Sequence, residues 1–247
     1  MKPIPSFKKL KLVCLKRGVY VDLDTIISRI AIYPTKLFLY TPLRPMHVML
    51  IWFILQLVAC FIIIYGGSYT IVGGILLFQL AIILDHSDGQ MARFLDEESV
   101  LALYVDQLYH NIANPLFILA LSYRADMVLI GIMIVAVYFL NRVIIFNHNV
   151  YNLKNERVER IIQETIGKDQ KKLAYSRMKA HEKTIFSRAY EWFRIEHPLS
   201  VMFWGALLGL LRWTLYLYLL LFIIDFFRRL FFQLKSLRDT DRLLQTK

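Results

Sequence analysis

Long apolar segments, separated by short polar stretches, dominate the chain from Pro45 onward. A bilayer-spanning helix needs about 20 predominantly apolar residues, and several of these segments approach or exceed that length. In a bilayer the backbone polar groups must be satisfied within the segment, which favours helices. We therefore predict an all-α integral membrane protein with six transmembrane helices, at 46–66, 69–84, 99–123, 126–147, 196–211 and 213–233.

The polar segments around these helices define the expected domains. Residues 1–45 form a cytosolic or interfacial segment, 46–233 the six-helix membrane domain, and 234–247 a cytosolic tail. Between Val21 and Tyr40, apolar residues are mixed with Arg29 and Lys36, which predicts an N-terminal interfacial amphipathic helix. Residues 1–44 are polar and basic, without the apolar core of a secretory signal.

Two segments leave alternatives open. The charged stretch 148–195 has a helical pattern near its start, so we expect one or more cytosolic helices, with a mobile linker as the alternative. The last apolar stretch, 198–232, is too long for one ordinary span and contains Arg212. We predict a tight outer turn at Leu210–Trp213. A single kinked helix would instead put the two termini on opposite sides of the membrane.

Composition and charge support a membrane protein and give its orientation. Hydrophobic residues make up 57% of the chain, too many for an ordinary soluble domain, and the net charge is +11. In the six-helix arrangement every Lys and Arg except Arg124 and Arg212 falls on one side. The positive-inside rule makes that side cytosolic, together with both termini. The charge is therefore expected to meet anionic membrane lipids rather than nucleic acid. The two cysteines are expected to be reduced thiols without a role.

Ionisable residues lie close together where the second and third apolar segments meet. Asp85 and Asp88 are three residues apart, and Asp106 and His110 are four apart. On helices each pair shares one face, so two facing pairs would form a compact cation site. Charges in or beside a bilayer are costly and usually have a partner or a function. Carboxylates are the hard ligands that Mg²⁺ or Mn²⁺ prefers.

This stretch resembles the signature of the CDP-alcohol phosphotransferase family, D-x2-D-G-x2-A-R-x8-G-x3-D-x3-D. Six positions match at the same spacing: Asp85, Asp88, Gly89, Ala92, Arg93 and Asp106. Two depart from it, because Ala102 stands in place of the second glycine and His110 in place of the last acid. The motif covers 26 residues, and the predicted topology also resembles that of the family.

The resemblance implies a site that opens to the cytosol and moves a phospho-alcohol or phosphatidyl group from a CDP-alcohol to a hydroxyl acceptor, with release of CMP. One or two divalent cations, Mg²⁺ or Mn²⁺, would be held by Asp85, Asp88, Asp106 and His110. Asp88, Gly89, Ala92 and Arg93 would bind the nucleotide and phosphates. Asp106 and His110 are the expected catalytic residues. The family also makes a homodimer plausible.

The histidine leaves four roles open. His110 is a general base, since its ordinary pKa suits proton removal at neutral pH; or it is a metal ligand that shifts preference towards Mn²⁺ or Zn²⁺. Alternatively the site runs on a single metal, or it is degenerate. The degenerate case corresponds to a rival function, a non-catalytic cation-binding transporter or scaffold. Gly89, Ala92 and Arg93 argue against that rival, because a nucleotide diphosphate needs them and an ion path does not. The sequence identifies neither the donor alcohol nor the acceptor, so the product could be a phospholipid, a glycolipid or a glycan.

Overall fold

The computed structural model describes residues 6–14, 23–67, 70–165 and 201–245, and every regular element among them is a helix. These are α1 (Phe7–Cys14), α2 (Leu23–Phe38), α3 (Pro45–Tyr65), α4 (Thr70–Leu95), α5 (Val100–Arg124), α6 (Val128–Thr165), α9 (Val201–Leu207) and α10 (Leu211–Gln245). They form two compact units. The first unit contains α1 to α5 and α9, and the second contains most of α6 and α10.

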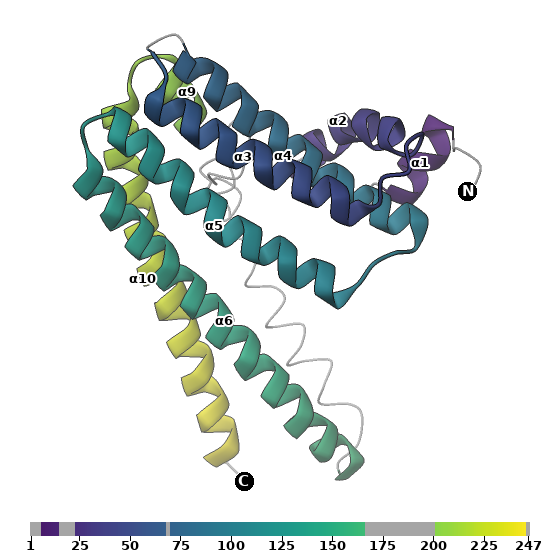
Figure 1. Ribbon diagram of the computed structural model, residues 1–247. Helices are drawn as coiled ribbons and strands as arrows, with labels where there is room; N and C mark the ends of the chain where they lie inside the picture. Colours follow the sequence, from purple (N-terminus) through teal and green to yellow (C-terminus); the bar gives the residue numbers. More distant parts are fainter. Residues whose placement is uncertain (1–5, 15–22, 68–69, 166–200, 246–247) are drawn as a thin grey trace. The chain divides into compact units, whose positions relative to one another are not determined.

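The first unit is built around α3, which packs against both α4 and α5 (Figure 1). Its most buried side chains include Trp52, Phe78 and Phe117, and the last two stack across α4 and α5 with ring centroids 3.9 Å apart. The short helices α1 and α2 lie against α4 (Figure 1). The two halves of the predicted site are therefore on α4 and α5, and α3 connects them.

Three described helices are long and apolar enough to cross a membrane: Pro45–Tyr65, Thr70–Leu95 and Val128–Asn147. They correspond to the first, second and fourth predicted spans. The third predicted span, 99–123, coincides with helix α5. This helix is long enough, but its polar residues make it less apolar than the other three. For the last two, α9 and α10 are helical, but residues 196–200 lie outside the described part of the chain. The all-helical membrane architecture is confirmed, and the count of six stays a prediction.

The helix of the second span is longer than predicted. The span was expected at 69–84, yet α4 continues through the whole first half of the motif to Leu95. No proline interrupts this stretch, and His86, Ser87 and Gln90 in it contact α2. The helix stops where Asp96 adopts a left-handed conformation (φ 63°) and the Glu97 amide donates to the Ala92 carbonyl, 2.9 Å away. This is the usual geometry of a helix C-terminus.

Helix α2 lies where the N-terminal amphipathic helix was expected. It buries Ile27, Ala31 and Thr35 and leaves Ile30 and Leu37 exposed. The buried face packs against α4. The exposed apolar residues fit a helix that also touches the bilayer surface, although that location stays a prediction.

In the second unit, α6 runs without a break from the apolar span into the charged segment and ends at Thr165. Residues 166–195 of the predicted cytosolic segment lie outside the described residues. Asn141 of α6 donates to the Phe222 carbonyl of α10, 3.4 Å away. One turn further along α10, the buried Asp225 accepts hydrogen bonds from Arg228 and Arg229, at 2.6 Å each. This carboxylate is thus compensated by two guanidinium groups, as a buried acid requires.

The break in the last apolar stretch falls slightly before the predicted position. Helix α9 ends at Leu207 and α10 begins at Leu211, so the turn is Leu208–Leu210. Gly209 has φ +74°, a conformation that favours glycine, and the Leu210 amide donates to the Gly205 carbonyl at 2.7 Å. The Arg212 Nε donates to the Ala125 carbonyl at the α5–α6 turn, 3.0 Å away, which satisfies one of the guanidinium donors.

Candidate functional site

Asp85, Asp106 and His110 converge between α4 and α5. The His110 Nε2 lies 3.4 Å from an Asp85 carboxylate oxygen and 3.5 Å from one of Asp106. One ligand atom from each of the three residues lies within 4.8 Å of the others, a spacing that a single cation can bridge. Two carboxylates and an imidazole are a chemically suitable donor set for Mg²⁺ or Mn²⁺. The predicted facing of the two halves of the motif is therefore present in the structure.

Asp88 is the fourth predicted ligand, and its environment differs from that of the other three. It is 6% exposed, and its Oδ2 accepts a hydrogen bond of 2.7 Å from the indole nitrogen of Trp52 on α3. It does not belong to the group of three that can share one ion among the described residues. The metal role of Asp88 stays a prediction.

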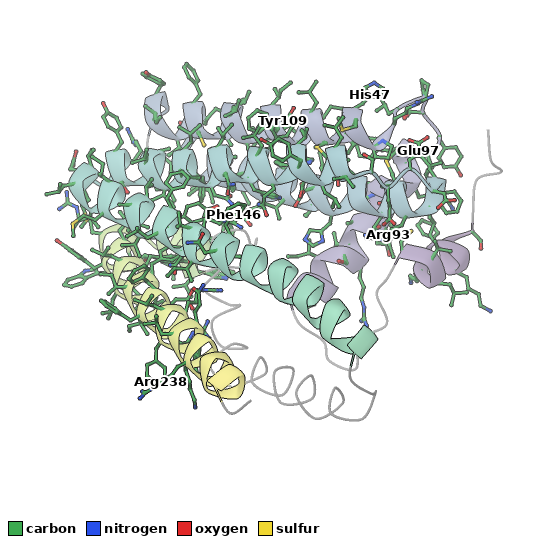
Figure 2. All side chains as sticks on the ribbon, turned by 90° about the horizontal axis from the view of Figure 1, so that it is seen from below. His47, Arg93, Glu97, Tyr109, Phe146 and Arg238 are labelled. Carbon is green, nitrogen blue, oxygen red and sulfur yellow. The ribbon has the colours of Figure 1, made fainter. Side chains whose placement is uncertain are left out.

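Aromatic rings form the wall of the site on the α3 side. The Trp52 ring stacks on His110 with centroids 5.0 Å apart and planes 28° apart. Next to it, Phe53 stacks on Tyr109, which Figure 2 labels, at 4.1 Å and 9°. Ala102, in place of the family's second glycine, packs against the buried cluster that contains Trp52. These contacts fix the position of α5 relative to α3 at the level of the acids.

Arg93 lies near the C-terminal end of α4 (Figure 2) and is tied to α1. Its Nη2 donates to the carbonyl of Cys14, 3.3 Å away. Its Nε is buried and has no hydrogen-bond partner among the described residues. A guanidinium has five N–H donors in a fork that matches phosphate, so Arg93 retains donors for an anion.

Gly89, one turn before Arg93, has space around it. A Cβ placed there would meet only Arg93 Nη1 within 4 Å, at 3.6 Å, among the residues the structure describes. Protein packing therefore does not require glycine at this position. A glycine inside a helix is less favourable than alanine by about 1 kcal/mol. Close approach of a ligand to the helix backbone would explain why it is there.

The residues between the motif positions face the N-terminal helices. Gln90 is fully buried, donates to the Ser28 carbonyl at 2.6 Å and accepts from the Thr35 hydroxyl at 2.9 Å. His86 contacts the Ser28 hydroxyl at 3.2 Å, and the Ser87 hydroxyl donates to the Ala31 carbonyl at 3.1 Å. One face of this part of α4 carries the motif and the other is held by α2.

Cys14, at the end of α1, belongs to this packing. It is 2% exposed, and its thiol donates to the Gln90 carbonyl at 3.4 Å. Burial raises the pKa of the Cys14 thiol, and the positive charge of Arg93 lowers it by a smaller amount. The thiol is therefore protonated at neutral pH, as expected for a cysteine that contributes packing.

Trp52 and Gln90 are the site residues that the sequence prediction missed. Trp52 is one of several aromatic residues in an apolar span, and only its indole N–H, which needs a partner when buried, sets it apart. A glutamine within an apolar helix, such as Gln90 or Gln56, is a weak signal of a buried hydrogen bond. Gln90 makes such bonds, whereas the Gln56 amide has no partner among the described residues.

An apolar helical bundle with two carboxylates and a histidine around a common point defines a membrane protein with a candidate cation site. The family model for CDP-alcohol phosphatidyltransferase matches residues 39–178, more than half of the chain. The chain therefore belongs to the CDP-alcohol phosphatidyltransferase family, whose members transfer a phospho-alcohol group from a CDP-alcohol and use divalent cations. Among curated proteins, none matches the chain.

Proposed function

We propose that this protein is a multi-pass membrane enzyme that transfers a phospho-alcohol or phosphatidyl group from a CDP-alcohol to a hydroxyl acceptor and releases CMP. The convergence of His110 with Asp85 and Asp106, at 3.4 and 3.5 Å, is the observation that carries this proposal. It brings the histidine that replaces the family's last acid close to two of the acids that would hold a cation. A chain that had lost the function would have no need to keep these groups together.

The donor would bind along α4. Arg93 would hold a phosphate with the N–H groups that are not used by Cys14, and Gly89 and Ala92 would let the diphosphate approach the helix. Asp85, Asp88 and Asp106 would hold Mg²⁺ or Mn²⁺, with His110 as a further ligand if its ring is not used as the base. When bound, such a cation neutralises charge on the phosphoryl oxygens and on the leaving group. The residues of the chain then position the acceptor and move its proton.

In the proposed reaction, a ring nitrogen of His110 takes the proton of the acceptor hydroxyl. The hydroxyl oxygen forms a bond to the phosphorus that carries the alcohol. The bond from that phosphorus to the bridging oxygen breaks, and CMP leaves with the electron pair. A neutral imidazole suits this step, because its ordinary pKa is close to neutral pH.

The first experiment measures CMP release by purified protein in detergent. CDP-diacylglycerol, CDP-choline, CDP-ethanolamine and CDP-glycerol are supplied in turn, with Mg²⁺ or Mn²⁺ and a total lipid extract as acceptor. Asp88→Asn is the blank. Asp126→Asn is the matched control, because Asp126 is 86% exposed and lies at the α5–α6 turn. Metal-dependent release that Asp88→Asn abolishes and Asp126→Asn preserves supports the proposal and identifies the donor.

Absence of release from all donors, without stabilisation of the protein by CMP or CDP, would favour the rival non-catalytic function. Ligand stabilisation is informative here because any ligand that binds only the folded state raises the apparent stability. Stabilisation by CDP without release would point to an untested acceptor rather than to a lost site.

The role of His110 is tested with His110→Gln. If His110 is the base, turnover should fall about 10²- to 10⁴-fold. Affinity for Mn²⁺ and for CDP should then stay near that of the unchanged protein. A parallel fall of Mn²⁺ affinity would instead make His110 a metal ligand, and near-normal turnover would remove it from the chemistry.

We also propose that both termini and the site face the cytosol, and that the basic segments meet anionic lipids. The uneven distribution of Lys and Arg supports this orientation. A cysteine introduced at Lys247, in a chain without Cys14 and Cys60, should react with an impermeant maleimide in inside-out vesicles only. Reaction in sealed right-side-out vesicles would contradict the orientation.

A further inference from the structure

Trp52 connects the two halves of the motif from a helix that the motif does not include. It lies in the middle of α3, and its side chain is completely buried. Its indole nitrogen donates to Asp88 on α4, and its ring stacks on His110 on α5. A single side chain thus contacts one residue of each half of the predicted metal site.

The hydrogen bond to Asp88 affects how this carboxylate can bind a cation. At 2.7 Å the indole N–H uses one lone pair of Oδ2, so it holds the Asp88 carboxyl group in one orientation towards a cation. Such outer partners orient metal-binding carboxylates, and their loss usually weakens metal affinity 10- to 100-fold.

The stacking contact concerns His110 specifically. The rotation of a histidine ring about its last side-chain bond is soft, so a packed neighbour decides its orientation. Trp52 lies nearly parallel to the ring, at 28° and 5.0 Å, while Nε2 lies close to Asp85 and Asp106. An aspartate at this position would have no ring to stack. Trp52 itself is held edge-on by Phe53 and Tyr109, with centroids 6.3 and 5.9 Å away.

We propose that Trp52 is a positioning residue of the metal site, which holds the orientation of the Asp88 carboxyl group and fixes the ring plane of His110. The inference rests on the proposed function in that the acids of the motif bind a divalent cation, and its part on His110 further requires that His110 is a ligand of that cation. It assigns to α3 a part in a site whose motif lies entirely on α4 and α5. It also assigns the stack to the histidine that distinguishes this chain from the family signature.

The test measures Mn²⁺ affinity by electron paramagnetic resonance of free Mn²⁺, on purified protein in detergent. Trp52→Phe removes the N–H donor and keeps an aromatic ring, whereas Trp52→Leu removes both. Each is made with His110 and with His110→Asp. Trp213→Phe is the matched control, because Trp213 is 73% exposed in the first turn of α10.

We expect Trp52→Phe to weaken Mn²⁺ binding about tenfold or more in both backgrounds. Trp52→Leu should weaken it further with His110 and not with His110→Asp, since only the imidazole loses its stacking partner. Unchanged affinity in both Trp52 variants would overturn the proposal. If Trp52→Leu lowered Mn²⁺ affinity below that of Trp52→Phe equally with His110 and with His110→Asp, the part of the proposal that concerns His110 would be overturned.

A second measurement keeps Trp52 in place, so it does not depend on the folding of the Trp52 variants. A chain that keeps Trp52 as its single tryptophan, with Trp192, Trp204 and Trp213 changed to Phe, should show quenching of Trp52 emission by Mn²⁺. The quenching should disappear in Asp106→Asn, and Mn²⁺ binding without quenching would overturn the proposal. If the unchanged protein binds no Mn²⁺ at all, the cation site of the proposed function fails, whereas normal binding with insensitive Trp52 variants refutes this inference alone.

Discussion

Restoring the family's acid with His110→Asp should make the protein depend on its cation for stability. His110 Nε2 lies 3.4 Å from Asp85 and 3.5 Å from Asp106. A shorter aspartate would place a third carboxylate at about 5 Å from that of Asp85, where two like charges repel by about 3 kcal/mol at an effective dielectric constant of about 20. The pair with Asp106 adds less, because Asp106 is 34% exposed and water screens it.

The assay is thermal unfolding in detergent, with EDTA and then with Mg²⁺. About 3 kcal/mol corresponds to about 6–12 °C for a chain of this size, so His110→Asp should unfold that much lower in EDTA. Mg²⁺ should recover most of the loss. His47→Asp is the matched control, since His47 is exposed in the first turn of α3, where an acid is favoured. Equal unfolding temperatures of His110→Asp and unchanged protein in EDTA would refute the close approach of the three groups.

Three further outcomes are expected. Gly89→Ala should leave stability unchanged or raise it by up to about 1 kcal/mol, because the Cβ has space and alanine favours the helix, while CDP affinity in a binding assay falls. A loss of stability instead would show that protein packing requires the glycine. Gln90→Leu should lower the free energy of unfolding by about 1–3 kcal/mol, because it removes two hydrogen bonds between α4 and α2, and Mn²⁺ affinity should stay the same. A loss of Mn²⁺ affinity without a loss of stability would contradict this purely structural role of Gln90. In a Cys60→Ala chain, burial and the raised pKa of the Cys14 thiol should make its alkylation slow at neutral pH, with a rise only above the ordinary thiol range. Rapid labelling at pH 7 without unfolding would contradict the packing of α1.

Helical spacing predicted which motif residues share a face, and the predicted topology placed the two faces opposite each other. Asp106 and His110 are one turn apart on α5, and Asp85 projects towards them from α4. Residue spacing also identified the three helices that are long and apolar enough to span a membrane. These features depend on the periodicity and length of apolar segments, which the linear sequence contains directly.

What the sequence could not predict depends on contacts between distant segments. The bond between Trp52 and Asp88 joins residues 36 positions apart, and the one between Thr35 and Gln90 joins residues 55 apart. The end of α4 was also misplaced, because polar residues after Asp85 suggested a loop. Those residues are helical since their side chains find partners on α2, a fact that only the packed structure contains.

The contacts between α2 and α4 have a practical consequence for anyone who produces this protein. The family match begins at residue 39, immediately after α2 ends at Phe38. An expression clone trimmed to the matched region would lack Ser28 and Thr35, and the Gln90 amide would lose both of its hydrogen-bond partners beside the acids. The extent of the family match therefore gives the wrong N-terminal boundary for this chain. An expression clone should therefore keep α1 and α2.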